Sequence, residues 1–510
     1  MDAPTLIEDR LVLIGAVLLV GVLAAVVARR LSVPVLVAFL GLGMLLGSEG
    51  PGGIEFDDPD LARSIGVVAL IVILFEGGLT TSWSDMRPVL VPAALLSTVG
   101  VGVTAAVTGV AAYALFDLSL AESFLLGAVV GSTDAAAVFA TLRFTTLRRR
   151  LAALLEAESG SNDPAAVALT LGLIAWITEP AYGAGDVAAL LLRQLGLGLV
   201  IGLGLGFLAA RLLPRFPVDL GPFSPVASLG IAALAYGVAD TAGASGFLAV
   251  YIVALFIGNA PMPLRRSLVA FHEGLAFLAQ VVLFVVLGLF VFPSELLPVA
   301  GAAVALAAVL TFVARPLAVL VSLTRLGFTL REHVLLGWAG LRGAVPIVLA
   351  TFALSAGVDA SGTIFNAVFF VVLMSALAQG LTLEPFARRL GLATEARPFY
   401  QQPLEVGVIR GLGGDILEYE VAGSDAVAGS PVRDLSLPPD ALVMLIVRGE
   451  TGIPPRGSTR VEPGDRLYVL ATGETREQVA RLLRQWERGP MPVPLHPVPA
   501  AEPDVRRRGD

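Results

Sequence analysis

The sequence of 510 residues contains no cysteine and no lysine, and only 15% of its residues are charged. The absence of cysteine excludes disulfides and thiolate metal sites. Soluble proteins carry roughly 25% charged residues, so this scarcity of charge, with a mean hydropathy of +0.83, indicates a membrane protein. The basic residues are scattered in pairs and the net charge is −8, so no nucleic-acid partner is expected. Metal-ligand spacings and nucleophile–base arrangements are also missing, and the sequence predicts no enzyme.

Apolar runs fill residues 1–390. Thirteen of them are long enough to cross a bilayer, or nearly so, and they lie at 9–28, 33–47, 62–80, 88–115, 121–142, 152–177, 187–212, 223–241, 244–260, 272–292, 296–322, 332–356 and 362–386. Arginines and acids alternate between the connecting loops, which places the N-terminus outside and the C-terminus in the cytoplasm. The first run ends in Arg29-Arg30, the reverse of a signal peptide's charge order, so we expect it to stay as a helix. The prediction is an all-α polytopic protein of the inner membrane, in contact with lipid.

Two segments of the chain resemble each other. The segment "LLGAVVGSTDAAAVFATL" (125–142) aligns without gaps on "LLGWAGLRGAVPIVLATF" (335–352). They are seven runs apart, so they cross the membrane in opposite directions. Each holds at its centre residues that a continuous apolar helix avoids, around Asp134 in the first and Arg342 in the second. Inverted repeats with interrupted helices form the midplane site of many secondary transporters, and the sequence predicts two such broken helices.

A cluster of polar residues opens the apolar run that contains "EAESGSNDPAAVALTLGLIAW" (156–176). One ionised Asp at the centre of a membrane helix costs roughly 2.5–3.5 kcal/mol. That cost is avoided only if the group faces a watery cavity or binds a cation. At helical spacing Ser159 and Asp163 share one face, and Glu158 and Asn162 share the adjacent face.

Two other runs contribute further acids. Asp134 lies in the broken repeat with Thr133 beside it, and Glu76 lies in "ILFEGGL". Carboxylates, hydroxyls and free carbonyls are hard oxygen donors, which replace water around an alkali cation. The sequence therefore predicts one site for an alkali cation and a proton, formed by these residues with Ser159 and Asp163.

Arg342 and Arg315 also lie inside apolar runs. Arg342 is central in its run and needs an acid partner, which Glu158 or Asp134 could supply. Arg315 lies near the end of its run, and we expect its side chain to reach the membrane interface. The alternative for single acids is a position at a helix end in water, and Glu158 is the most open to it.

The composition changes after Arg389. Four short alternating stretches, "LEVGVIR", "DILEYEVA", "ALVMLIVR" and "DRLYVLAT", predict strands, and residues 474–486 predict a helix. We expect a linker at 391–403, a small cytoplasmic α+β domain at 404–486, and a disordered tail at 487–510.

The membrane segments resemble the monovalent cation:proton antiporter superfamily, in the branch with an Asn-Asp pair that includes bacterial and animal Na⁺/H⁺ exchangers. The resemblance covers residues 10–390 and rests on "ESGSNDPAA", "GSTDAAAV", "LFEGGL" and "GLRGAVPIVLA". It implies a homodimer in which a six-helix core moves like an elevator against a dimer domain.

The resemblance also implies the ion ligands. Asp163 matches the residue at which cation and proton compete. Ser159 and the backbone carbonyl of Thr133 match groups that coordinate the cation. Asp134 and Glu76 match acids that act through water.

Three further positions match structural residues of the family's site. Asn162 matches the residue that bridges the two crossing half-helices, and Glu158 with Arg342 matches a buried ion pair. Because Asn162 replaces a second acid and Glu158 would be neutralised, one titrating charge remains. We therefore predict one-for-one, electroneutral exchange.

The C-terminal domain is similar to the C-terminal subdomain of RCK proteins, the regulators of potassium conductance. The most recognisable part is "GIPPRGSTRVEPGDRLYVLAT". The similarity implies the bacterial potassium/proton subgroup and a small-molecule or nucleotide regulator at residues 404–486. The nucleotide-binding half of a full RCK module has no match, which leaves the regulator open.

The sequence thus predicts exchange of a monovalent cation for H⁺, with no cofactor besides the transported ions, and the RCK-like domain favours K⁺. A Na⁺/H⁺ antiporter for sodium extrusion and pH homeostasis is the first alternative. An RCK-gated channel would need a filter such as Thr-Val-Gly-Tyr-Gly, which the sequence lacks. A membrane receptor would not need acids in the middle of its spans.

Overall fold

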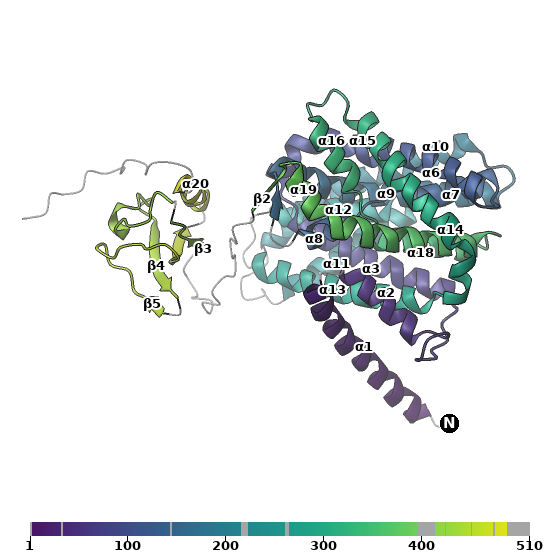
Figure 1. Cartoon of the computed structure of the whole chain (residues 1–510), viewed down its shortest axis with the longest axis horizontal. Helices are drawn as coiled ribbons and strands as arrows, with labels where there is room; N and C mark the ends of the chain where they lie inside the picture. The colour runs from purple at the N-terminus through teal and green to yellow at the C-terminus, as the bar shows by residue number, and fades with distance from the viewer. Residues whose placement is uncertain are drawn as a thin grey trace, which may run out of the picture. The chain divides into compact units, whose positions relative to one another are not determined.

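The structure is a computed structural model that describes residues 3–31, 34–142, 145–215, 223–260, 265–395, 414–423, 425–449, 451–472 and 475–486. The chain divides into two compact units, residues 1–395 and 396–510, and each is considered by itself. The first unit is a bundle of helices (Figure 1). The second contains a small sheet.

The helices of the first unit follow the apolar runs of the sequence. They are α1 (Ala3–Leu31), α2 (Val35–Leu46), α3 (Pro59–Thr80), α4 (Trp83–Met86), α5 (Leu90–Leu95), α6 (Val101–Leu115), α7 (Leu120–Val129), α8 (Ala135–Thr141), α9 (Arg149–Thr178), α10 (Ala184–Leu212), α11 (Ser224–Thr241), α12 (Gly246–Asn259), α13 (Arg265–Leu289), α14 (Pro293–Val309), α15 (Arg315–Leu323), α16 (Leu330–Trp338), α17 (Ala344–Ser355), α18 (Ser361–Met374) and α19 (Gly380–Arg389). Each predicted run coincides with a helix or with consecutive helical segments.

The first unit is mostly helical, as the sequence predicts. Among the described residues, six helices are long and apolar enough to cross a membrane on those criteria: Pro59–Thr80, Trp83–Leu115, Ala184–Leu212, Ser267–Leu289, Pro293–Leu323 and Ser361–Arg389. Several other helices are apolar but shorter. The total of thirteen spans and the orientation of the termini stay predictions.

Both copies of the internal repeat are broken helices, as the sequence predicts. In the first copy α7 ends at Val129 and α8 begins at Ala135, and in the second α16 ends at Trp338 and α17 begins at Ala344. The two breaks begin within one residue of equivalent places in the alignment. The side chain of Asp134 accepts a hydrogen bond from the third backbone N–H of α8 at 3.0 Å, so this acid also starts the new helix.

Three of the long helices contain a π-turn. These turns are η2 (Leu96–Gly100), η5 (Leu310–Ala314) and η6 (Ser375–Gln379), and each joins two α-helical segments without a loop. A π-turn inserts one extra residue into a helix and often occurs at a functional site.

Burial separates the inner helices from the outer ones. Every residue of α17 from Ala344 to Ala353 is buried, whereas α10 exposes Leu192 and Val200 on one face. An exposed apolar face suits contact with lipid. On its other face α10 packs closely on α12, because a Cβ at Gly202 would touch Ala249.

A two-stranded antiparallel sheet also belongs to the first unit. It pairs β1 (Thr145–Leu147) with β2 (Ala393–Glu395). The residues of β2 lie in the stretch predicted as the linker 391–403, so that linker begins with an ordered strand. Residues 396–403 lie outside the described residues.

The second unit is an antiparallel sheet covered by one helix. Its strands are β3 (Gly414–Glu420), β4 (Ala441–Arg448), β5 (Thr451–Ile453) and β6 (Arg466–Thr472), in the order β3-β6-β4-β5, followed by α20 (Arg476–Trp486). Three predicted strands and the predicted helix are confirmed. The predicted strand at 404–410 and the predicted tail at 487–510 lie outside the described residues.

The core of the second unit is closed by Trp486. Its side chain is 0% exposed, and its ring packs edge-on against Tyr419 with a centroid distance of 5.3 Å. It lies among apolar residues of the strands and of α20, such as Leu467 and Leu483.

We expect Trp486→Ala to lower the free energy of unfolding of the second unit by about 3–5 kcal/mol, the usual loss when a buried tryptophan is truncated. Limited proteolysis of the full chain measures this as faster cleavage within residues 414–486. Leu442→Ala is the matched control, because Leu442 is 63% exposed. Equal cleavage rates for the two variants would contradict the assignment of Trp486 to the core.

Candidate cation-binding site

The two broken helices meet at their breaks. The backbone N–H of Asp134 donates to the carbonyl of Leu341 at 2.8 Å, which joins the first break directly to the second. Gly343 permits this approach, because a Cβ there would collide with the carboxylate of Asp134. Broken backbone can lie within a membrane protein only where such partners exist.

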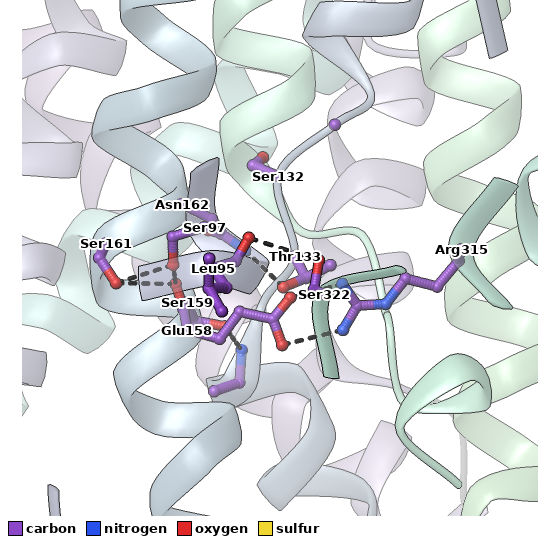
Figure 2. Close-up of polar contacts among 12 residues, drawn as sticks. Leu95, Ser97, Ser132, Thr133, Glu158, Ser159, Ser161, Asn162, Arg315 and Ser322 are labelled. Atoms are coloured by element: carbon purple, nitrogen blue, oxygen red, sulfur yellow. Dashed lines mark hydrogen bonds and ion pairs between the residues drawn. The ribbon is translucent and has the colours of Figure 1, made fainter. Parts of the chain in front are cut away.

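Two side chains of helix α9 form hydrogen bonds at the first break. The side-chain amide of Asn162 donates to the hydroxyl of Thr133 at 2.6 Å, and the hydroxyl of Ser159 accepts from the N–H of Ala135 at 2.8 Å. Asn162 is fully buried. The amide therefore ties α9 to the first break (Figure 2), and the predicted bridge between the two broken helices stays a prediction.

Glu158 forms a buried ion pair with Arg315. The two guanidinium nitrogens approach the two carboxylate oxygens at 2.5 and 2.9 Å, and the side chains are 1% and 3% exposed. Figure 2 shows the two groups pointing toward each other. This geometry corrects one prediction, because Arg315 does not reach the interface. It also excludes the alternative that Glu158 lies at a helix end in water.

Arg342 has a different role from the predicted ion pair with Glu158. Its guanidinium donates to the carbonyl of Gly131 at 2.8 Å and to the carbonyl of Ser132. These carbonyls follow the C-terminal end of α7, where the helix dipole is negative, so the positive charge is stabilised there. The prediction that Glu158 takes Arg342 as its partner is wrong, since Arg315 occupies both carboxylate oxygens.

All three π-turns supply contacts to this region. Ser97 of η2 donates to the carbonyl of Glu158 at 3.1 Å, and η5 ends immediately before Arg315. Ser375 of η6 accepts from the N–H of Arg342 at 3.0 Å. Each π-turn thus contains, or directly precedes, a polar residue whose side chain contacts α9 or the second break.

A cavity of about 660 Å³ reaches the breaks. Asp134, Asp163 and Glu384 are its acids, and no basic side chain is among the described residues that line it. Its remaining wall includes the start of α2, parts of α3 and α13, and α19.

The deepest acid of the cavity has an unsatisfied oxygen. Asp163 is 9% exposed, and its Oδ1 has no hydrogen-bond partner among the described residues. The Oδ1 of Asn162 is unpartnered as well. Two buried oxygen acceptors without donors suit a bound cation or a proton, because leaving them unpaired costs free energy.

The structure gathers most of the predicted ligands but not all of them. Thr133, Asp134 and Asp163 line the cavity, and the hydroxyl of Ser159 is taken by the backbone of α8. Glu76 is half-buried on α3 and is not among the lining residues. Binding of a cation by any of these residues stays a prediction.

Sequence reasoning missed Glu384 and the role of Arg315. Glu384 accepts a hydrogen bond from Arg388 one turn later at 2.9 Å, which reads in the sequence as an ordinary surface pair. Arg315 could have been suspected, because residues 316–322 of its apolar run still follow it.

Comparison with known proteins agrees with this architecture. The chain belongs to the sodium/hydrogen exchanger family, whose transmembrane profile matches residues 15–389. A TrkA-C domain matches residues 416–484, which confirms the predicted kinship of the second unit.

Individual relatives carry antiporter names. The K(+)/H(+) antiporter NhaP2 of Shewanella sp. (strain MR-4) is 39% identical over 489 residues, which covers 95% of this chain and 85% of the relative. The Na(+)/H(+) antiporter NhaS2 of Synechocystis sp. is 29% identical over 401 residues, or 76% of this chain and 71% of the relative. The solved structure of the sodium proton antiporter MjNhaP1 from Methanocaldococcus jannaschii is similar with a TM-score of 0.67 at 25% identity, and covers 75% of this chain and 99% of that chain.

The ion pair can be tested by rescue. Glu158→Gln leaves the buried charge of Arg315 unpaired, and we expect it to lower the free energy of unfolding by about 3–5 kcal/mol. Adding Arg315→Gln should recover most of this loss, whereas adding Arg342→Gln should not. Thermal unfolding of the purified variants in detergent measures the difference. If Arg342→Gln recovered the stability instead, Glu158 would pair with Arg342, as the sequence predicts.

Proposed function

We propose that this chain exchanges K⁺ for H⁺ across the inner membrane, with both ions binding in turn at Asp163. The observation that carries the proposal is the unpartnered carboxylate oxygen of Asp163 in a cavity whose described lining has acids and no base. The kinship with named K(+)/H(+) antiporters supports the reaction class.

The cycle follows from the cost of a buried charge. A lone carboxylate at the end of this cavity is costly, and the cost disappears when it holds a proton or an alkali cation. Asp163 is therefore neutral in two alternative ways. A carrier that changes its access only when this site is neutral exchanges one ion for the other.

The stoichiometry follows from the neighbouring charges. Glu158 is compensated by Arg315 through two hydrogen bonds, and Asn162 carries no charge. If Asp163 alone changes its occupancy during the cycle, each turnover exchanges one cation for one proton. The exchange is then electroneutral.

Na⁺ is the second candidate for the cation. The relatives that support it are the NhaS2 and MjNhaP1 proteins, both named as sodium antiporters. Oxygen donors bind both ions, and the choice depends on the number and spacing of ligands. Our preference for K⁺ rests on the higher identity to the NhaP2 group and on the TrkA-C-type domain.

The working assembly is also part of the proposal. We infer a homodimer with the N-terminus outside and the C-terminus in the cytoplasm, surrounded by lipid and regulated through the second unit by a small molecule or nucleotide. Support comes from the alternating loop charges and from the cavity between α2, α3 and α13 on one side and the broken helices on the other. That division suits an elevator-like movement of the broken helices.

We expect Asp163→Asn to abolish exchange while the protein still inserts and purifies, since an amide cannot hold a proton and a cation in turn. Proton flux in proteoliposomes is measured after K⁺, Na⁺ or Li⁺ is added in turn, which also ranks the cations. Asp359→Asn is the matched control, an exposed acid in the loop between α17 and α18. Wild-type flux in Asp163→Asn would favour a different site or a receptor without transport.

Electroneutral exchange predicts a rate that does not depend on membrane potential. Proteoliposomes with the potential clamped at several values should show the same initial proton flux at a fixed cation gradient. A flux that increases steadily with the potential would mean that more than one charge moves per cycle. Glu76 or Asp134 would then be the first groups to examine.

A further inference from the structure

Two strands far apart in the sequence tie the C-terminal end of the membrane unit to the start of α9. Thr145, Thr146 and Leu147 of β1 pair with Glu395, Thr394 and Ala393 of β2 in antiparallel register. The pattern continues one step, because the N–H of Arg148 donates to the carbonyl of Leu392 at 3.3 Å.

The places of these strands in the chain make the pairing significant. β1 lies between α8, whose N-cap is Asp134, and α9, which carries Asp163. β2 follows α19, whose Glu384 lines the cavity, and it is the last element of the first unit before the chain continues to the second. The β1–β2 ladder therefore connects two parts of the chain. One leads to the second unit, and the other joins α8 to α9, the helices next to Asp134 and Asp163.

The N-terminus of α9 lacks the usual devices that stabilise a helix start. It has no side-chain cap and no acid in its first turn, and two arginines, Arg149 and Arg150, stand there against the helix dipole. Its capping residue Arg148 is instead held by the residues just before β2, through its N–H to Leu392 and its guanidinium to the carbonyl of Gly391 at 3.4 Å. Arg149 also pairs with Asp85, and Arg150 donates to the carbonyls of Leu326 and Gly327, so the segment that leads into β2 is one of several supports of the start of α9.

Packing extends the same connection. Leu147 and Leu392 are 6% and 3% exposed and lie in one apolar cluster with Leu154 of α9 and Leu383 of α19. Helix α9 continues unbroken from Arg149 through Asp163. A shift of its first turn is thus carried along the helix to the carboxylate, about 21 Å away at about 1.5 Å per residue.

We propose that the β1–β2 ladder transmits the state of the C-terminal domain to the cation site. A change in that domain moves or releases β2, the start of α9 follows, and the affinity of the Asp163 site changes. This regulation rests on the proposed exchange function. It requires no contact between the two units other than the chain itself.

The test combines a change in the C-terminal domain with a break in the ladder, both in the full chain. Trp486→Ala perturbs the C-terminal core, and the K⁺ concentration for half-maximal proton flux is measured in proteoliposomes. We expect this concentration to change by about fivefold or more, within the usual range of coupling between two sites. In a chain whose ladder is broken, the same substitution should change it by less than about twofold.

Thr394→Pro breaks the ladder. Since the pair Arg148–Leu392 is hydrogen-bonded, the alternation of an antiparallel ladder makes Thr146–Thr394 the next bonded pair, and proline removes its donor. Ala393→Pro is the control, because its N–H points away from β1. If Thr394→Pro fails to fold, as judged by size exclusion and maximal flux, Thr146→Pro removes the equivalent bond from β1.

The outcomes separate the two proposals. No cation-dependent proton flux in the wild-type chain would reject the exchange function. Normal flux with no effect of Trp486→Ala, or with the same effect in intact and broken ladders, would reject the ladder as the connection and leave the exchange function standing. Loss of the Trp486→Ala effect in both Thr394→Pro and Ala393→Pro would also reject it.

Discussion

The site depends on how α9 holds an extended backbone inside a membrane domain. Peptide groups without helical partners are tolerated there only when other groups bond them. Ser159 of α9 accepts from the N–H of Ala135 beside the first break, and Arg342 donates to a carbonyl at the end of α7. Asn162 of α9 holds the side-chain hydroxyl of Thr133 in the same break. Because the same helix carries Asp163, the bonds that permit the break also fix the carboxylate beside it. The position of the acid and the shape of the cavity cannot change separately.

Sequence could predict these features because the membrane makes polar residues costly. An acid in the middle of an apolar run needs a reason, and Asp134 and Asp163 both lie at the cavity. The internal repeat predicted a break around Asp134 and another around Arg342, because the residues there differ from those of a continuous apolar span, and both breaks are present. The strands of the second unit followed from their alternating pattern.

The pairing of charges could not be predicted in the same way. Arg315, Arg342 and several acids lie within apolar runs. The composition does not determine which of these charged groups form ion pairs. The π-turn Leu310–Ala314 directly precedes Arg315, whose side chain points toward Glu158. The residue types in this turn do not predict that the helix contains an extra residue. Glu76 lies outside the lining of the cavity, and its predicted action through water stays a prediction.

The extra residue in Leu310–Ala314 makes the spacing of the chain as important as its chemistry. Deleting any one residue there would leave an ordinary helix that is still long enough for the bilayer. It would also rotate the two halves by about 100° relative to each other and point Arg315 away from Glu158. Related chains can therefore vary the side chains of this turn, but a gap inside it in an alignment would signal that the buried ion pair has been lost or rebuilt.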